Sequence, residues 1–333
     1  MLRALIAGSL GWFICTIASP AHAADPCPLL RTQVAASDVA TRIAAYACKE
    51  NQDWFRPFID ADGRSGGLGV YEAENGLLAD GTAAWRKVAQ YWIESGTGGG
   101  GECGYAASSP YPSPGCRSFV IDRPWSAAFV SWVMRKAGLP GFRYSAGHID
   151  YVRQAYRDPA SSPYLVQAPL GGKPAPGDLL CYVRMDSRIF GFGQLATLLS
   201  MPDASGLAMH CDIVVAADPS MTWLVGGNVQ NTVTLRALKL DARGYLSGLP
   251  MRTLADPVCS PNAPANCNAN RQDWAVLLKL KPPAELARLP QPPRPIGAPT
   301  PLAPTHCAAV AGGMQVCSSG ASAPQPVPAD ETR

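Results

Sequence analysis

Apolar residues recur at intervals of three and four positions in the first half of the chain, and this spacing predicts helices over residues 37–56, 82–93 and 122–138. In the third stretch, the aromatic and aliphatic positions gather on one side of the helix, which indicates a face packed into a core. We expect Asp122 to be the N-cap of this helix and Gly138 to provide its C-terminal stop.

After residue 170 the pattern changes to short runs rich in β-branched and aromatic residues, bounded by Pro, Gly, Asp and Asn. Helices that come first and strands that come second predict an α+β domain, in which the N-terminal helices pack on a mostly antiparallel sheet. The predicted strands cover residues 179–183, 210–215, 222–225, 229–235 and 274–280.

The N-terminal segment has the features of a secretory signal peptide. Arg3 precedes an apolar stretch over 4–18, and Ala21-His22-Ala23 forms a small-residue cleavage site. The sequence therefore predicts a signal peptide over 1–23 and a periplasmic or secreted mature protein. A membrane anchor is the alternative, but the stretch is shorter than the roughly 20 residues that span a bilayer, so we expect no stable span after cleavage.

The C-terminal segment differs in composition from the rest of the chain. Twelve of the 32 prolines lie in the last 52 residues, and few residues there are able to build a core. We therefore expect one domain over 24–282, with its helical part first, and a Pro/Ala-rich tail over 283–333.

Composition and cysteine content narrow the class of protein. A net charge of +3 over 333 residues is too small for the basic surface that nucleic-acid-binding proteins present. Removal of the signal peptide leaves ten of the 11 cysteines, an even number that indicates disulfides, while the lack of a C-x-x-C pair argues against structural zinc. Pairing of sequence neighbours is the simplest connectivity: 27–48, 103–116, 181–211, 259–267 and 307–317.

A hairpin argument brings candidate catalytic residues together. If a turn near Pro219 joins two strands, His210 lies opposite Asn228, within reach of an orienting hydrogen bond. Asp212 lies on the same face as His210 and is a rival orienting carboxylate, since side chains alternate along a strand. Ser126, in the first turn of the third helix, is the candidate nucleophile, because free N–H groups there favour developing negative charge.

Several motifs resemble those of the CHAP family of cysteine- and histidine-dependent amidohydrolases and peptidases, which have a papain-like fold and NlpC-type relatives. The series as a whole resembles a bacterial family of unknown function in which Ser takes the position of the catalytic Cys. The motifs are Pro124-Trp125-Ser126-Ala127-Ala128-Phe129, Pro176-Gly177-Asp178-Leu179, His210-Cys211-Asp212-Ile213-Val214 and Gly226-Gly227-Asn228-Val229.

The resemblance implies a nucleophile at Ser126, a general base at His210 and an orienting residue at Asn228, with no cofactor and no metal. Trp125, Asp212 and His148 are second-line candidates for the same site. The leading hypothesis is an exported hydrolase that cleaves an amide bond in cell-wall peptide (peptidoglycan) by acyl transfer. The alternatives are an esterase and a catalytically inactive module that binds cell-wall peptide or a protein partner.

Overall fold

The computed structural model divides the chain into two compact units, Met1–Pro292 and Pro293–Arg333. It describes residues 25–67, 69–72, 74–104, 113–202 and 206–291 in full, and the backbone of 306–310 and 314–318. The predicted signal peptide over 1–23 and most of the predicted tail lie outside the described residues. No helix in the described part of the chain is both long enough and apolar enough to cross a membrane.

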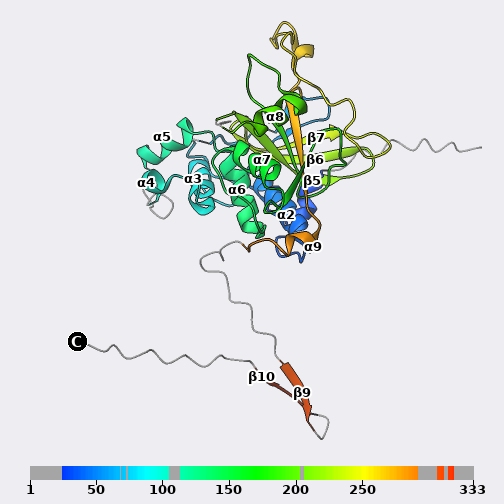
Figure 1. Cartoon of the computed structure of the whole chain (residues 1–333). Helices are drawn as coiled ribbons and strands as arrows, with labels where there is room; N and C mark the ends of the chain where they lie inside the picture. Colours follow the sequence, from blue (N-terminus) through cyan, green and yellow to red (C-terminus); the bar gives the residue numbers. More distant parts are fainter. Residues whose placement is uncertain are drawn as a thin grey trace, which may run out of the picture. The chain divides into compact units, whose positions relative to one another are not determined.

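The first unit is built around one eight-stranded sheet, of which β5, β6 and β7 are labelled in Figure 1. The strand order is β2-β1-β7-β6-β5-β4-β8-β3. β1 pairs with β7 in parallel, and the other neighbouring strands are antiparallel. The predicted mostly antiparallel sheet is therefore confirmed. Its strands are β1 (Phe58–Ile59), β2 (Ser65–Gly66), β3 (Tyr164–Gln167), β4 (Leu179–Val183), β5 (Met209–Ala217), β6 (Met221–Val229), β7 (Thr232–Lys239) and β8 (Asp273–Leu280).

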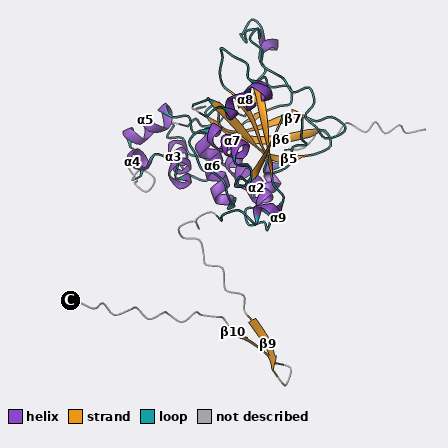
Figure 2. Ribbon diagram, viewed as in Figure 1, coloured by secondary structure: helices purple, strands orange, loops and turns teal. Residues whose placement is uncertain are grey.

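Helices pack on the sheet and on one another (Figure 2). α2 and α6 contact β5 and β6, and α7 contacts β3 and β5. α3 packs on α6, and α5 packs on α3. The described helices are α1 (Cys27–Leu30), α2 (Val39–Asp53), α3 (Ala84–Ser95), α4 (Gly100–Cys103), α5 (Pro114–Asp122), α6 (Ser126–Ala137), α7 (His148–Arg157), α8 (Gly191–Ser200) and α9 (Pro283–Leu286), with a 3-10 turn at Pro264–Asn266.

The start of α6 differs from the sequence-based expectation. Asp122 is the last residue of α5, and Arg123 has the extended backbone that a following proline favours. The helix therefore begins only at Ser126, with Trp125 in the N-cap position and no side-chain cap. Its end is as predicted, because Gly138 adopts a left-handed conformation (φ 70°) and accommodates the C-terminal hydrogen bonds.

Two apolar clusters stabilise the unit, one between the helices and the sheet and a smaller one on the opposite face of the sheet. Leu286 and Leu289 are buried in the larger cluster, so the chain packs on the core beyond residue 282. In the second unit, β9 (His306–Val310) and β10 (Met314–Ser318) form a two-stranded antiparallel sheet.

Disulfides connect sequence neighbours, as expected. The four bridges in the described residues are Cys27–Cys48, Cys103–Cys116, Cys181–Cys211 and Cys259–Cys267. Cys307 and Cys317 are opposite each other in the register of β9 and β10, but their side chains lie outside the described residues. Four disulfides are compatible with an oxidising compartment such as the periplasm or the extracellular space.

Candidate active site

Ser126 is the first residue of α6, and its hydroxyl Oγ lies 2.7 Å from Nε2 of His148. Both side chains are almost fully buried, with exposed fractions of 4% and 3%. The first N–H groups of a helix have no acceptor within the helix, so the N-terminus of α6 provides donors next to the hydroxyl. Ser126 therefore has a potential base and an anion-stabilising helix end in contact with it.

His148 is held by its own helix. It begins α7, and its Nδ1 makes a hydrogen bond with the hydroxyl of Tyr151, three residues further on. Burial, followed by the proximity of His210, lowers the pKa of His148 well below its ordinary value. The imidazole is therefore neutral at pH 7, and one tautomer, with the proton on Nδ1, leaves Nε2 free to accept the Ser126 proton.

His210 belongs to a second buried polar group, on β5. Its Nε2 donates to Oδ1 of Asp212 at 2.8 Å, and Nε of Arg236 donates to Oδ2 of Asp212, also at 2.8 Å. Arg236 also donates to Oδ1 of Asn270 at 2.8 Å. Although burial alone would raise the pKa of Asp212, Arg236 and His210 hold it well below its ordinary value. Asp212 is therefore ionised and accepts both hydrogen bonds.

The two histidines are neighbours. The ring centroids of His148 and His210 lie 5.2 Å apart. The His210 ring also contacts Tyr182, with a centroid separation of 5.0 Å. Ser126, His148, His210 and Asp212 thus form one buried polar cluster. Within the described residues, the Ser126 hydroxyl bonds His148, the second-line candidate, and does not bond His210.

Asn228 does not lie opposite His210 in the sheet. The expected hairpin register holds for Ile213 opposite Val225, but the β5–β6 pairing ends there and does not reach His210. On its β4 side, His210 pairs with Tyr182. The β6–β7 register shifts at Asn228, whose φ of 56° is left-handed. This irregularity redirects the Asn228 side chain, and the orienting contact of His210 is made by Asp212.

Asn228 instead supports the start of α6. With its amide nitrogen facing Glu72, it donates to Oε2 of Glu72 at 3.1 Å and accepts from the Trp125 backbone N–H at 3.2 Å. The Trp125 indole N–H also donates to Glu72 Oε2, at 2.5 Å. Burial raises the pKa of Glu72, although the Trp125 hydrogen bond lowers it in part. Asn228 and Glu72 thus fix the residue that precedes Ser126.

Trp125 is a core residue and not a ligand platform. It is fully buried, and its ring stacks on Trp54 and Tyr91 with centroid separations of 5.7 and 5.5 Å. Because Trp125 is also the N-cap of α6, this packing positions the Ser126 backbone.

Three residues that contact the site residues were not predicted from sequence. Tyr151 follows His148 at a spacing of three, which places both on one helix face once α7 is recognised. Arg236 lies on β7, and its pairing with Asp212 depends on the strand order. Glu72 lies in a loop that no periodic signal predicts. In the part of the chain that is described, no three His, Cys, Asp or Glu side chains are grouped so as to hold a metal ion.

Comparison with known proteins identifies a family but no characterised relative. No curated protein and no solved structure matches the chain. A family model described as uncharacterized protein conserved in bacteria (DUF2272) matches residues 79–280, which include Ser126, His148, His210, Asp212 and Asn228. Because this match covers more than half of the sequence, the chain belongs to the DUF2272 family of bacterial proteins.

Proposed function

We propose that the protein is an exported serine-type acyl hydrolase in which Ser126 is the nucleophile and His148 is the general base. The observation that carries the proposal is the 2.7 Å contact between Ser126 Oγ and His148 Nε2 at the N-terminus of α6. A hydroxyl needs proton removal during attack, and a buried neutral imidazole in direct contact supplies it.

The reaction would proceed by acyl transfer. Ser126 Oγ attacks the carbonyl carbon as its proton moves to His148 Nε2, and the first-turn N–H groups of α6 face the tetrahedral oxyanion. His148 then returns the proton to the leaving amine, and water attacks the acyl-Ser126 ester to release the acid. The nearby Asp212 carboxylate favours the transient positive charge on His148.

A papain-like arrangement and a cell-wall substrate are the finer parts of the proposal. In support, α6 carries the nucleophile and packs on β5 and β6, and His210 lies at the start of β5. The predicted signal peptide and the four disulfides support action outside the cytoplasm, where peptidoglycan contains amide bonds of the kind this mechanism would cleave. Esters are a chemically easier substrate for the same hydroxyl.

The test is incubation of the purified chain with peptidoglycan, followed by measurement of newly released amines. We expect release by the wild type and none by Ser126→Ala, and a serine-reactive fluorophosphonate should label the wild type only. Ser131→Ala is the matched control, because Ser131 is also a buried serine of α6 but bonds Ser145. Equal release by Ser126→Ala would refute the mechanism.

A catalytically inactive binding module is the second candidate, and the burial of the cluster favours it. Ser126 is 4% exposed and His210 is 1% exposed, so a substrate reaches the hydroxyl only if covering residues move. This candidate predicts no fluorophosphonate labelling but retention of the chain on peptidoglycan in a pull-down. Labelling at Ser126 would exclude it.

A further inference from the structure

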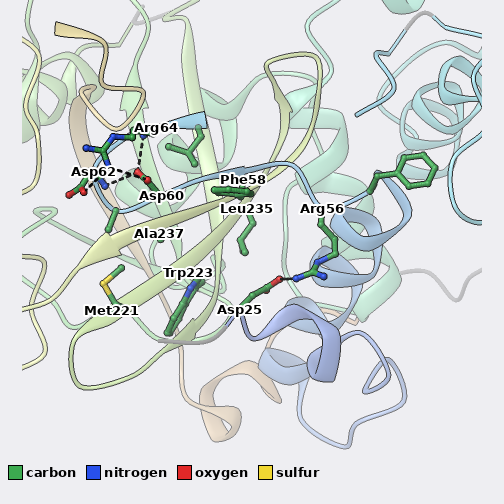
Figure 3. Close-up of a pocket in the computed structure, with 13 residues that line it drawn as sticks. Asp25, Arg56, Phe58, Asp60, Asp62, Arg64, Met221, Trp223, Leu235 and Ala237 are labelled. Atoms are coloured by element: carbon green, nitrogen blue, oxygen red, sulfur yellow. Dashed lines mark hydrogen bonds and ion pairs between the residues drawn. The ribbon is translucent and has the colours of Figure 1, made fainter. Parts of the chain in front are cut away.

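A cavity of about 820 Å³ lies outside the Ser126 cluster, at the end of the sheet where β1, β6 and β7 meet (Figure 3). Its floor is apolar and consists of Met221 and Trp223 on β6 and Leu235 and Ala237 on β7. The volume is in the range of small-molecule binding sites, which are commonly about 300–1,000 Å³. None of the lining residues belongs to the Ser126–His148 group.

Phe58 forms an aromatic platform in this cavity. Its side chain is 44% exposed, although it lies within β1. Gly66 is its register partner on β2, and a Cβ added to Gly66 would lie 2.4 Å from the Phe58 Cζ atom. The glycine therefore lets the ring lie directly over the β2 backbone. One face of the ring is supported in this way, and the side chain remains accessible to a ligand.

Charged side chains of both signs flank the platform. In the view of Figure 3, the ring lies between the Asp25–Arg56 pair and a group formed by Asp60, Asp62 and Arg64. Arg56 donates to Asp25 at 2.8 Å, and Arg64 donates to Asp62 at 3.3 Å. Asp62 also pairs with Lys239, so the two carboxylates of this group face two cations, and neither end of the cavity favours a ligand of one charge. A neutral ligand with many hydroxyls is the best match.

The rim has an unusual backbone. Phe55 and Arg56 are consecutive residues with φ values of 65° and 61°, a left-handed conformation that bulky residues rarely adopt. Both residues line the cavity, and Phe55 is also half-exposed. The Phe55 and Arg56 N–H groups donate to the Gln52 and Asn51 carbonyls at the end of α2, so this backbone turns the chain toward β1 and places both side chains at the rim.

We propose that this cavity binds a neutral saccharide, one pyranose ring of which stacks on Phe58. The axial C–H groups of a pyranose pack on an aromatic face, while its equatorial hydroxyls extend sideways toward carboxylate and guanidinium groups. An extended apolar ligand would displace water from the charged pairs at both ends without offering them hydrogen bonds, and it would therefore bind less well. The proposal does not depend on catalysis by Ser126.

The test is a calorimetric titration of the full chain from residue 24, carrying Ser126→Ala so that no hydrolysis contributes. The probes are a β-1,4-linked N-acetylglucosamine tetramer and an α-1,4-linked glucose tetramer. We expect saturable binding of at least one of them, and the difference between them distinguishes a wall-type glycan from an α-glucan. Phe58→Ala should weaken that binding about tenfold or more, a change of about 1.4 kcal/mol.

Two further variants sharpen the result. Phe58→Leu keeps apolar bulk at the site, so weakened binding in this variant assigns the effect to the aromatic ring. Leu165→Ala truncates a 39% exposed apolar side chain on β3, at the opposite edge of the sheet, and should bind as the wild type does. Failure of both tetramers to bind at millimolar concentration, or unchanged affinity in both Phe58 variants, would overturn the saccharide site.

Discussion

The Ser126 hydroxyl lies 2.7 Å from the His148 imidazole, although 22 positions separate the two residues along the chain. Each is the first residue of its helix, so the N-termini of α6 and α7 meet at this contact. Two helix N-termini produce a positive potential, which favours an oxyanion at Ser126 and disfavours a permanently charged His148. This potential acts in the same direction as the burial that keeps His148 neutral, and it supports the proposed acyl transfer.

The first prediction separates the two histidines. If His148 is the base, His148→Asn should reduce fluorophosphonate labelling of Ser126 by about 10²-fold or more, because a general base contributes that much. His210→Asn should have a smaller effect, since His210 acts on the site only through its neighbours. Labelling rates of the two folded variants, measured side by side, decide the matter. If His210→Asn reduces the labelling rate more than His148→Asn does, His210 and not His148 is the base.

Tyr151→Phe tests the orientation of His148. The variant removes the hydroxyl that bonds Nδ1 while the ring stays packed. We expect kcat to fall about tenfold with little change in KM, because a rotated imidazole or the wrong tautomer no longer accepts the Ser126 proton. Tyr156→Phe, also on α7, is the matched control and should leave kcat unchanged. A Tyr151→Phe enzyme with the wild-type pH profile and kcat would argue against an orienting role.

The sign of the pH dependence follows from the lowered pKa of His148. Because the folded protein protonates this residue only well below pH 6.5, the acid limb of activity should lie well below pH 6.5. The free energy of unfolding should also decline as the pH falls below 6.5, since the unfolded chain then binds a proton at His148 that the native protein does not. His148→Gln should show a shallower decline of Tm below pH 6.5 than the wild type. An acid limb at or above pH 6.5 would contradict the assignment.

The sequence predicted the parts of the site that depend on local pattern. Ser126 was correctly placed in the first turn of a helix, and alternation along β5 correctly put Asp212 on the His210 side and Cys211 on the other. The disulfide between Cys211 and Cys181 confirms that alternation. These inferences needed only helical or strand periodicity, which short sequence stretches carry.

Other parts of the site depend on packing between segments that are distant in the sequence, and local patterns do not predict such packing. The contact between His148 and Ser126 requires α7 to be placed against the end of the sheet, and the Glu72 loop reaches Trp125 from 53 positions away. Asn228 was expected to continue a regular hairpin, but the left-handed residue and register shift at that point redirect it. Asn228 therefore contacts Glu72 and Trp125, and Asp212 makes the hydrogen bond to His210.

The disulfides should differ in their contributions to stability. The Cys181–Cys211 bridge closes 30 residues and Cys259–Cys267 closes eight. In the chain-entropy view, removing the first as a double Ala variant should cost roughly 3–4 kcal/mol and removing the second roughly 2–3 kcal/mol. Urea unfolding at one pH compares the two variants. Equal losses would indicate that loop entropy is not the dominant contribution.

The buried Asp212–Arg236 pair leads to the last prediction. Both side chains are almost fully buried, and Gly226 allows the carboxylate to approach, because a Cβ there would lie 1.9 Å from Asp212 Oδ1. Arg236→Met leaves a buried carboxylate with only the hydrogen bond from His210, so the free energy of unfolding should fall by roughly 3–5 kcal/mol.

Its control is Lys239→Met, which breaks an exposed ion pair with Asp62 and should leave the free energy of unfolding close to that of the wild type, because solvent screens the pair. The double variant Asp212→Asn/Arg236→Met removes both charges and should recover part of the loss, because no unpaired charge remains buried. Urea unfolding of all three variants at pH 7 measures these differences. If Arg236→Met is no less stable than Lys239→Met, the buried pair does not stabilise the fold, and Asp212 is then retained for its contact with His210.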